Sequence, residues 1–134
     1  MLSMKSYPNS PDLSPARGYS HVVSTSGGRT IYVAGQIAMD KDGNIVGKGD
    51  LKAQARQVLE NVTAALGAAG ATFKDVVKAN TYVVNLGPDS LAAIREARAD
   101  FYPAEDPPAS TLVGVTALAF PDLLIEIEVV AVVD

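Results

Sequence analysis

The chain has 134 residues, 48% of them hydrophobic and 19% charged, which is enough apolar material for one packed domain and too much for an intrinsically disordered chain. Its formal charge is -4, from 11 Lys and Arg against 15 Asp and Glu, and an acidic chain with scattered basic residues is poorly suited to nucleic-acid binding. Cysteine is absent and there is one histidine, which excludes disulfides and thiolate chemistry and disfavours zinc or iron sites.

The N-terminal residues 1–16 predict a loop-like arm, because Pro8, Pro11 and Pro15 alternate with polar residues. No stretch approaches the roughly 20 apolar residues that cross a bilayer, and the start lacks the apolar centre of a signal peptide. We therefore expect a cytoplasmic protein without a membrane partner, folded as one domain over residues 1–134.

Two strands are predicted next, over residues 19–26 and 29–37. Gly27-Gly28 between them is typical of a two-residue hairpin turn, so the two strands are expected to pair. Gly35, inside the second strand, would allow another backbone or a ligand to approach closely.

Two amphipathic helices are predicted in the middle of the chain. The first begins after Asp50, a suitable N-cap, and runs to about Ala69 before Gly70. Its apolar side chains form one stripe at a 3.6-residue period: Leu51, Ala55, Val58, Leu59, Val62 and Leu66. The second runs from about Asp89 or Ser90 to Tyr102, and its apolar side holds Leu91, Ile94, the aliphatic stem of Arg98, and Phe101.

The remaining strands are predicted over residues 76–84, 111–118 and 123–133, which makes the fold α+β, with two helices on one face of a mixed sheet. Side chains alternate along a strand, and both sides of the last strand carry large aliphatic residues. The helices can cover only one side, so the other side is expected to meet a copy of itself in a homo-oligomer. A monomer with a half-exposed face is the less favoured alternative.

Glu126 and Glu128 are two apart on the last strand, which places both carboxylates on one face about 7 Å apart. Burial disfavours the ionised form of a carboxylate, and a carboxylate tuned in this way is a candidate general acid or base. The alternative is structural: Glu128 would pair with Lys78 or an arginine, and Glu126 would only line a wall. His21, the single side chain that titrates near neutrality, is interpreted as a hydrogen-bonded structural residue.

Four segments resemble the RidA/YjgF/UK114 family: Gly35-Gln36, the Asp-Val-Val-Lys run at 75–78, the Pro-Ala-Ser-Thr-Leu-Val-Gly-Val run at 108–115, and Ile-Glu-Ile-Glu at 125–128. The resemblance covers the chain from about Pro15 to its end. It implies a chorismate-mutase-like fold and a homotrimer with a small-molecule cleft between each pair of subunits. It also implies hydrolysis of 2-imino or enamine acids to 2-keto acids and ammonia, without a metal or another cofactor.

Carried over position by position, the resemblance makes Glu126 the catalytic residue that positions water. It assigns substrate binding to Tyr19, Gly35, Ser110, Thr111 and Leu112. The family's carboxylate-binding arginine corresponds to Ser110, whose hydroxyl supplies neither the charge nor the two-pronged geometry of a guanidinium. Arg17 is a candidate substitute, although a solvated surface arginine is the more common situation.

We therefore expect a trimer that binds a small imine, enamine or carbonyl metabolite, and we favour hydrolysis of that metabolite over binding alone. Deamination of standard 2-imino acids is expected to be weak or absent. The alternative is a non-catalytic ligand-binding or chaperone-like trimer. RNA cleavage, an activity after which this endoribonuclease L-PSP-like family is named, is disfavoured by the acidic charge and the absence of a basic stripe.

Overall fold

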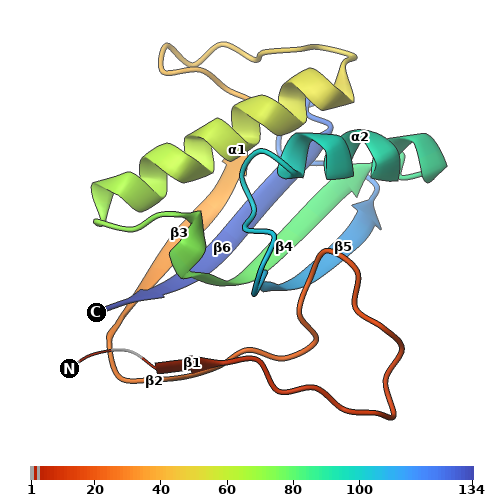
Figure 1. The fold of residues 1–134 in the computed structure, drawn as a ribbon. Coiled ribbons are helices and arrows are strands. Elements are labelled where there is room, and N and C mark those ends of the chain that lie inside the picture. Colours follow the sequence, from red (N-terminus) through yellow and green to blue (C-terminus); the bar gives the residue numbers. More distant parts are fainter. Residues whose placement is uncertain (1, 3) are drawn as a thin grey trace.

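The computed structural model describes residue 2 and residues 4–134. It contains two helices, a short 3₁₀ turn and six strands within that part of the chain (Figure 1). In chain order the elements are β1 (Met4–Ser6), β2 (Ser24–Ser26), β3 (Arg29–Ile37), α1 (Leu51–Ala68), the 3₁₀ turn (Phe73–Asp75), β4 (Val76–Val84), α2 (Pro88–Arg98), β5 (Ala109–Val115) and β6 (Ile125–Val133).

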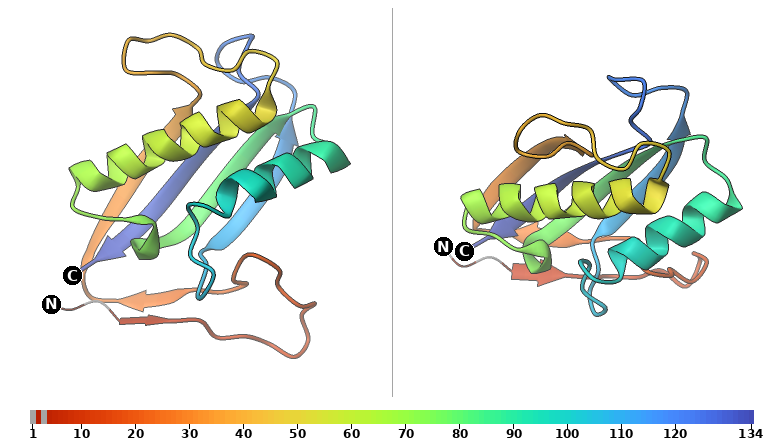
Figure 2. Two further views of the ribbon diagram at one scale, coloured as in Figure 1. Left: turned by 45° about the horizontal axis from the view of Figure 1, so that its top comes forward. Right: turned by 90° about the horizontal axis from the view of Figure 1, so that it is seen from above.

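Four strands form the main sheet in the order β3-β6-β4-β5. The β4 and β5 pair is parallel, because α2 crosses over between them, and the other two pairs are antiparallel. Figure 2 shows that α1 and α2 lie on the same face of this sheet. The predicted α+β class, with both helices on one face, is confirmed.

The helix α1 begins and ends as the sequence predicts. The Asp50 side chain accepts a hydrogen bond from the Ala53 backbone N–H at 3.1 Å, which caps the N-terminus, and Gly70 has a φ of 78° just after the last turn. Five of the six predicted stripe residues are buried, and Leu51 is partly buried. Gln54, which the apolar pattern missed, is also fully buried because its amide bonds the backbone of residues 47, 122 and 124.

The strand β6 supplies the centre of the core. Its helix-side residues are all buried, from Ile125 at 0% exposure to Val133 at 9%. On the opposite, open face, Leu124 and Glu126 are only partly buried. The open face also carries Tyr32 of β3, which is 80% exposed. The predicted contrast between a covered and an uncovered face is therefore present within one chain.

The predicted hairpin of residues 19–26 and 29–37 is wrong. Only Ser24–Ser26 of the first segment is a strand, and it pairs with Met4–Ser6 of the arm that was predicted to be a loop. Gly27 and Gly28 do turn the chain, with φ of 70° and 75°, but β3 then pairs with β6. The hydrophobic edge of β6 is the stronger partner because it continues the buried core. Residues 1 and 3 of the predicted arm lie outside the described residues.

The second helix is shorter than predicted, since α2 ends at Arg98 and residues 99–102 form turns. This difference affects the site, because the turns carry Tyr102 back beneath the helix end. Across the described residues, no helix combines the length and apolarity that a bilayer span requires.

Candidate functional site

Glu126 and Gly35 lie together on the open face of the sheet. A Cβ built on Gly35 would be 2.0 Å from Glu126 Oε2, so only glycine leaves room for this carboxylate beside the β3 backbone. The sequence predicts that another backbone or a ligand approaches Gly35, whereas in the structure the approaching group is the Glu126 side chain of the same sheet. A cavity of about 520 Å³ opens beside Gly35, between β3 and α1.

Glu128 has polar partners of its own on the same face. The Tyr82 hydroxyl donates a short hydrogen bond to Glu128 Oε1, and Asn80 Nδ2 donates to the same oxygen at 3.3 Å. The hydrogen bond to Glu128 raises the pKa of Tyr82, and desolvation adds to it, because both favour the neutral phenol. The structural alternative pairs Glu128 with Lys78 or an arginine, but its partners in the structure are Tyr82 and Asn80, and Lys78 Nζ donates to Thr111 Oγ1 at 2.8 Å.

The predicted substrate-binding residues of β5 are divided between the two faces. Ser110 is paired with Ala79 and Leu112 with Thr81, and both of these β4 residues are fully buried on the helix side. Leu112 packs against the hydrophobic core. Thr111 faces the open side with Lys78. Ser110 and Leu112 therefore lie on the opposite face of the sheet from Glu126.

Tyr19 and Arg17 are placed by a segment that runs along the start of β5. The Ser20 backbone N–H donates to the Pro108 carbonyl at 3.1 Å, and Ser20 Oγ donates to the Pro107 carbonyl at 2.5 Å. His21 Nε2 lies 2.7 Å from the Ser14 carbonyl oxygen, and its ring meets the Tyr19 ring edge-on with 5.3 Å between centroids. The structural interpretation of His21 agrees with these contacts, because the imidazole holds Tyr19 in position.

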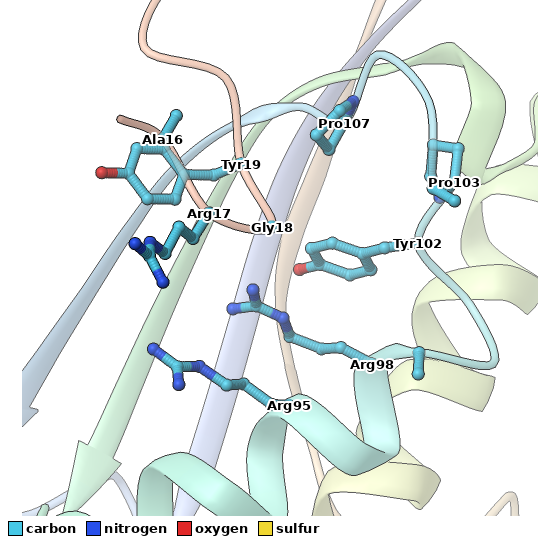
Figure 3. A pocket seen from close by; sticks show the side chains of 11 residues that line it. Ala16, Arg17, Gly18, Tyr19, Arg95, Arg98, Tyr102, Pro103 and Pro107 are labelled. Carbon is cyan, nitrogen blue, oxygen red and sulfur yellow. The ribbon is translucent and has the colours of Figure 1, made fainter. Parts of the chain in front are cut away.

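A cavity of about 640 Å³ opens between this segment and the C-terminal end of α2 (Figure 3). It is lined by the predicted residues Arg17 and Tyr19 and by three residues that sequence reasoning did not assign to a site: Arg95, Arg98 and Tyr102. Arg98 was expected to lend its aliphatic stem to the core. In the helix that the sequence predicts as far as Tyr102, positions 95, 98 and 102 share one side, and that spacing was the available signal.

The hydroxyl groups of Tyr102 and Thr81 are both buried, and neither has a hydrogen-bond partner of standard geometry among the described residues. Burial raises the pKa of Tyr102, and the positive charge of Arg98 partly opposes the rise. The phenol therefore remains neutral, and it offers its ring to the cavity. The described residues contain no cluster of three or more His, Asp or Glu side chains that would hold a metal ion.

The site residues thus form two separate groups in one chain. One group, Glu126 with Gly35, can orient water or move a proton on the open face. The other group, around Arg17 and Tyr19, offers positive charge and aromatic rings on the helix side of the sheet. A reaction that used both groups would require a second subunit to bring the Glu126 of one chain to the cavity of another.

Residues 9–133 match the family model described as Endoribonuclease L-PSP. The chain belongs to this family, which is also known as RidA/YjgF/UK114. It is 42% identical over 118 residues to a RutC family protein of Pyrococcus horikoshii, covering 87% of this chain and 88% of the relative. It is 33% identical over 120 residues to the 2-iminobutanoate/2-iminopropanoate deaminase of Dermatophagoides farinae, covering 90% and 89% of the two chains.

Among solved structures, a Rid family protein of unknown function from Yersinia pestis, YyfB, superimposes with a TM-score of 0.90 at 46% identity. The match covers 96% of this chain and 98% of YyfB. The predicted family resemblance is confirmed over nearly the whole chain, and with it the RidA-like fold.

Proposed function

We propose that the protein is a homotrimer that hydrolyses a small imine or enamine metabolite at clefts between its subunits. The observation that carries the proposal is the position of the Glu126 carboxylate, beside Gly35 on a sheet face that no helix covers. Ser110 and Leu112, two of the predicted substrate-binding residues, lie on the other face, so a cleft that uses them together with Glu126 must combine two chains. The similarity to the deaminase of Dermatophagoides farinae supports the reaction class.

The reaction needs no group beyond those that the chain supplies. Water adds to the electrophilic C=N carbon, and Glu126 orients the water and takes its proton while the π electrons move to nitrogen, which is protonated. In the second step the hydroxyl proton of the carbinolamine passes to its nitrogen, the C–N bond breaks as the C=O bond forms, and ammonia leaves. The products are a carbonyl compound and ammonia, so one water is consumed in each turnover.

The Ser110 position argues for a substrate other than the simple 2-imino acids. A hydroxyl cannot replace a bidentate guanidinium, and removing one partner of a buried, hydrogen-bonded charge pair costs about 2–5 kcal/mol. Because about 1.4 kcal/mol corresponds to a factor of ten, the native chain should hydrolyse 2-iminopropionate at least roughly 30-fold more slowly than Ser110→Arg.

The test generates 2-iminopropionate in place with an amino-acid oxidase and follows keto-acid release. We expect a slow native chain, a faster Ser110→Arg variant, and loss of the remaining activity in Glu126→Gln. Sedimentation of the native chain should give three times 13.9 kDa. A fast native chain would contradict the interpretation of position 110, and activity that survives Glu126→Gln would contradict the role of Glu126.

A non-catalytic ligand-binding trimer is the second candidate, and the neutral Ser110 favours it. If the protein only binds, neither the native chain nor Ser110→Arg will release keto acid, and Glu126→Gln will lower the affinity for a ligand without any change in turnover. The same assay therefore separates the two candidates.

A further inference from the structure

The charges on α2 are arranged differently on its two sides. Glu96 accepts an ion-pair contact from Lys52 at 2.6 Å, and Asp100, just past the helix end, accepts one from Arg56 at 2.8 Å. Arg95, on the side that faces the cavity, has no carboxylate within 4 Å among the described residues. Glu96 and Asp100 are thus paired with α1 residues and not with the arginines that line the cavity.

Arg98 is held in place although it too lacks an acidic partner within that part of the chain. Its guanidinium carbon lies 4.9 Å from the centroid of the Tyr102 ring, a stacking arrangement that orients the planar group. On the Gly18 side, a Cβ would lie only 3.8 Å from Arg98 Nη2, and Gly18 has a φ of +76°, which favours glycine. The turn at Gly18 therefore brings the N-terminal segment against a preorganised guanidinium.

Arg17, next to that turn, adds a third positive charge. Figure 3 shows the guanidinium groups of Arg17, Arg95 and Arg98 directed toward the same side of the cavity. The chain has five arginines and a net charge of -4, so three of its five arginines meet at one place in an acidic protein. Like charges held close together repel, and a bound anion relieves that repulsion.

The rest of the cavity is apolar. Ala16, Ala99, Pro103 and Pro107 line it beside the two tyrosines, and its volume of about 640 Å³ far exceeds that of a bare inorganic anion. A ligand that fits this lining combines acid groups with a short carbon skeleton. The guanidinium fork matches carboxylates in a two-pronged geometry.

We propose that the Arg17, Arg95 and Arg98 cluster binds a small dicarboxylic acid. As a statement about the substrate it rests on the proposed function: one carboxylate of the substrate is then anchored from α2 and the N-terminal segment, in place of the arginine that position 110 lacks. The substrate class becomes an imine or enamine that carries two acid groups.

The experiment measures binding by titration calorimetry at low ionic strength, with succinate, acetate and inorganic phosphate as probes, on the full chain. We expect succinate to bind at least tenfold more tightly than acetate or phosphate. Arg95→Gln, whose side chain is exposed, and Arg98→Gln should each weaken succinate binding about tenfold, because a charge-assisted hydrogen bond is lost. Arg98→Lys, which keeps the charge but not the fork, should weaken it less than Arg98→Gln.

Arg29→Gln is the matched control, because Arg29 lies on β3 at the opposite edge of the sheet, where its side chain donates to the Ala69 carbonyl at 3.0 Å. It should leave succinate affinity within twofold. Equal affinities for the three probes, or equal losses in Arg29→Gln and Arg95→Gln, would overturn the proposal. Phosphate binding as tight as succinate binding would overturn the assignment to an organic diacid.

This outcome is separable from that of the proposed function. If succinate binding depends on the arginines but the chain hydrolyses no imine, the dicarboxylate site is supported and the proposed hydrolytic function is contradicted. If 2-iminopropionate is hydrolysed in a Glu126-dependent way but succinate binding does not depend on the arginines, the hydrolytic function is supported and the dicarboxylate site is contradicted.

Discussion

The two faces of the main sheet come from the same strands but differ in how far their side chains are buried. Along β6, Ile125, Ile127 and Val129 are at most 2% exposed beneath the helices, whereas Glu126 between them is only partly buried. The helix face is completed by this chain alone. The open face has Tyr32 exposed at its edge and the hydrogen-bonded Glu128 carboxylate at its centre. It therefore exposes both apolar and polar side chains that no other part of this chain covers. The buried core and the candidate catalytic carboxylate are thus separated by the two-residue period of a strand.

The largest effect that tests this separation is Ile127→Ala. Ile127 is 0% exposed at the centre of the core, so truncation should lower the free energy of unfolding by about 2–5 kcal/mol, through lost burial and a residual cavity. Denaturant titration measures this. Val130→Ala, on the open face of the same strand, should cost less than half as much in the isolated subunit; an equal cost would mean that the two faces do not differ.

The next test addresses what completes the open face. Tyr32→Asp introduces a carboxylate into an exposed apolar position that the proposed trimer would bury. We expect sedimentation to give a single subunit near 13.9 kDa, with far-UV circular dichroism unchanged. Tyr32→Phe is the control and should assemble as the native chain does. A Tyr32→Asp protein that assembles like the native chain would contradict an interface at this face.

Gly35→Ala tests the open face separately from the core, because the atoms nearest to the added methyl group belong to the Glu126 side chain and not to a core residue. The new methyl group collides with the flexible end of Glu126, so the carboxylate must move while the backbone stays in place. The free energy of unfolding should change by less than about 1 kcal/mol, and imine hydrolysis, where the native chain shows it, should fall to the level of Glu126→Gln. Gly67→Ala is the control: its Cβ meets nothing within 4 Å in α1, and it should stabilise the fold by up to about 1 kcal/mol.

The smallest effect concerns pH. Burial raises the pKa of Tyr102 above its ordinary value of 10.0, so folding favours the neutral phenol. The sign follows from linkage: this contribution is fully present below pH 10, and it is lost as the pH rises through the folded-state value. Stability measured between pH 9 and 11 should therefore fall less steeply in Tyr102→Phe than in the native chain. Parallel curves would show that Tyr102 ionises equally in both states.

The residues that form the core could be predicted from the sequence because their signal is local. The stripe of α1, its Asp50 cap and the alternation of β6 depend on periods of 3.6 and 2 residues, and β4 was predicted over its observed bounds. The candidate site was predicted only in part. Glu126, Gly35 and Tyr19 were found through motif and strand position, whereas Arg95 and the cavity were not, because a solvated arginine and a ligand-binding arginine look the same on a helix.

The sequence by itself determined the positions of α1, β3, β4 and β6 and the family, since each depends on a local period or motif. Only the tertiary structure decided that β3 pairs with β6, that Glu128 bonds Tyr82 instead of Lys78, and that Arg17 meets Arg98 across 81 positions of the chain. The physical reason is that strand partners and clustered charges are chosen by long-range packing, in which many pairings satisfy the same local pattern and the buried core selects one of them.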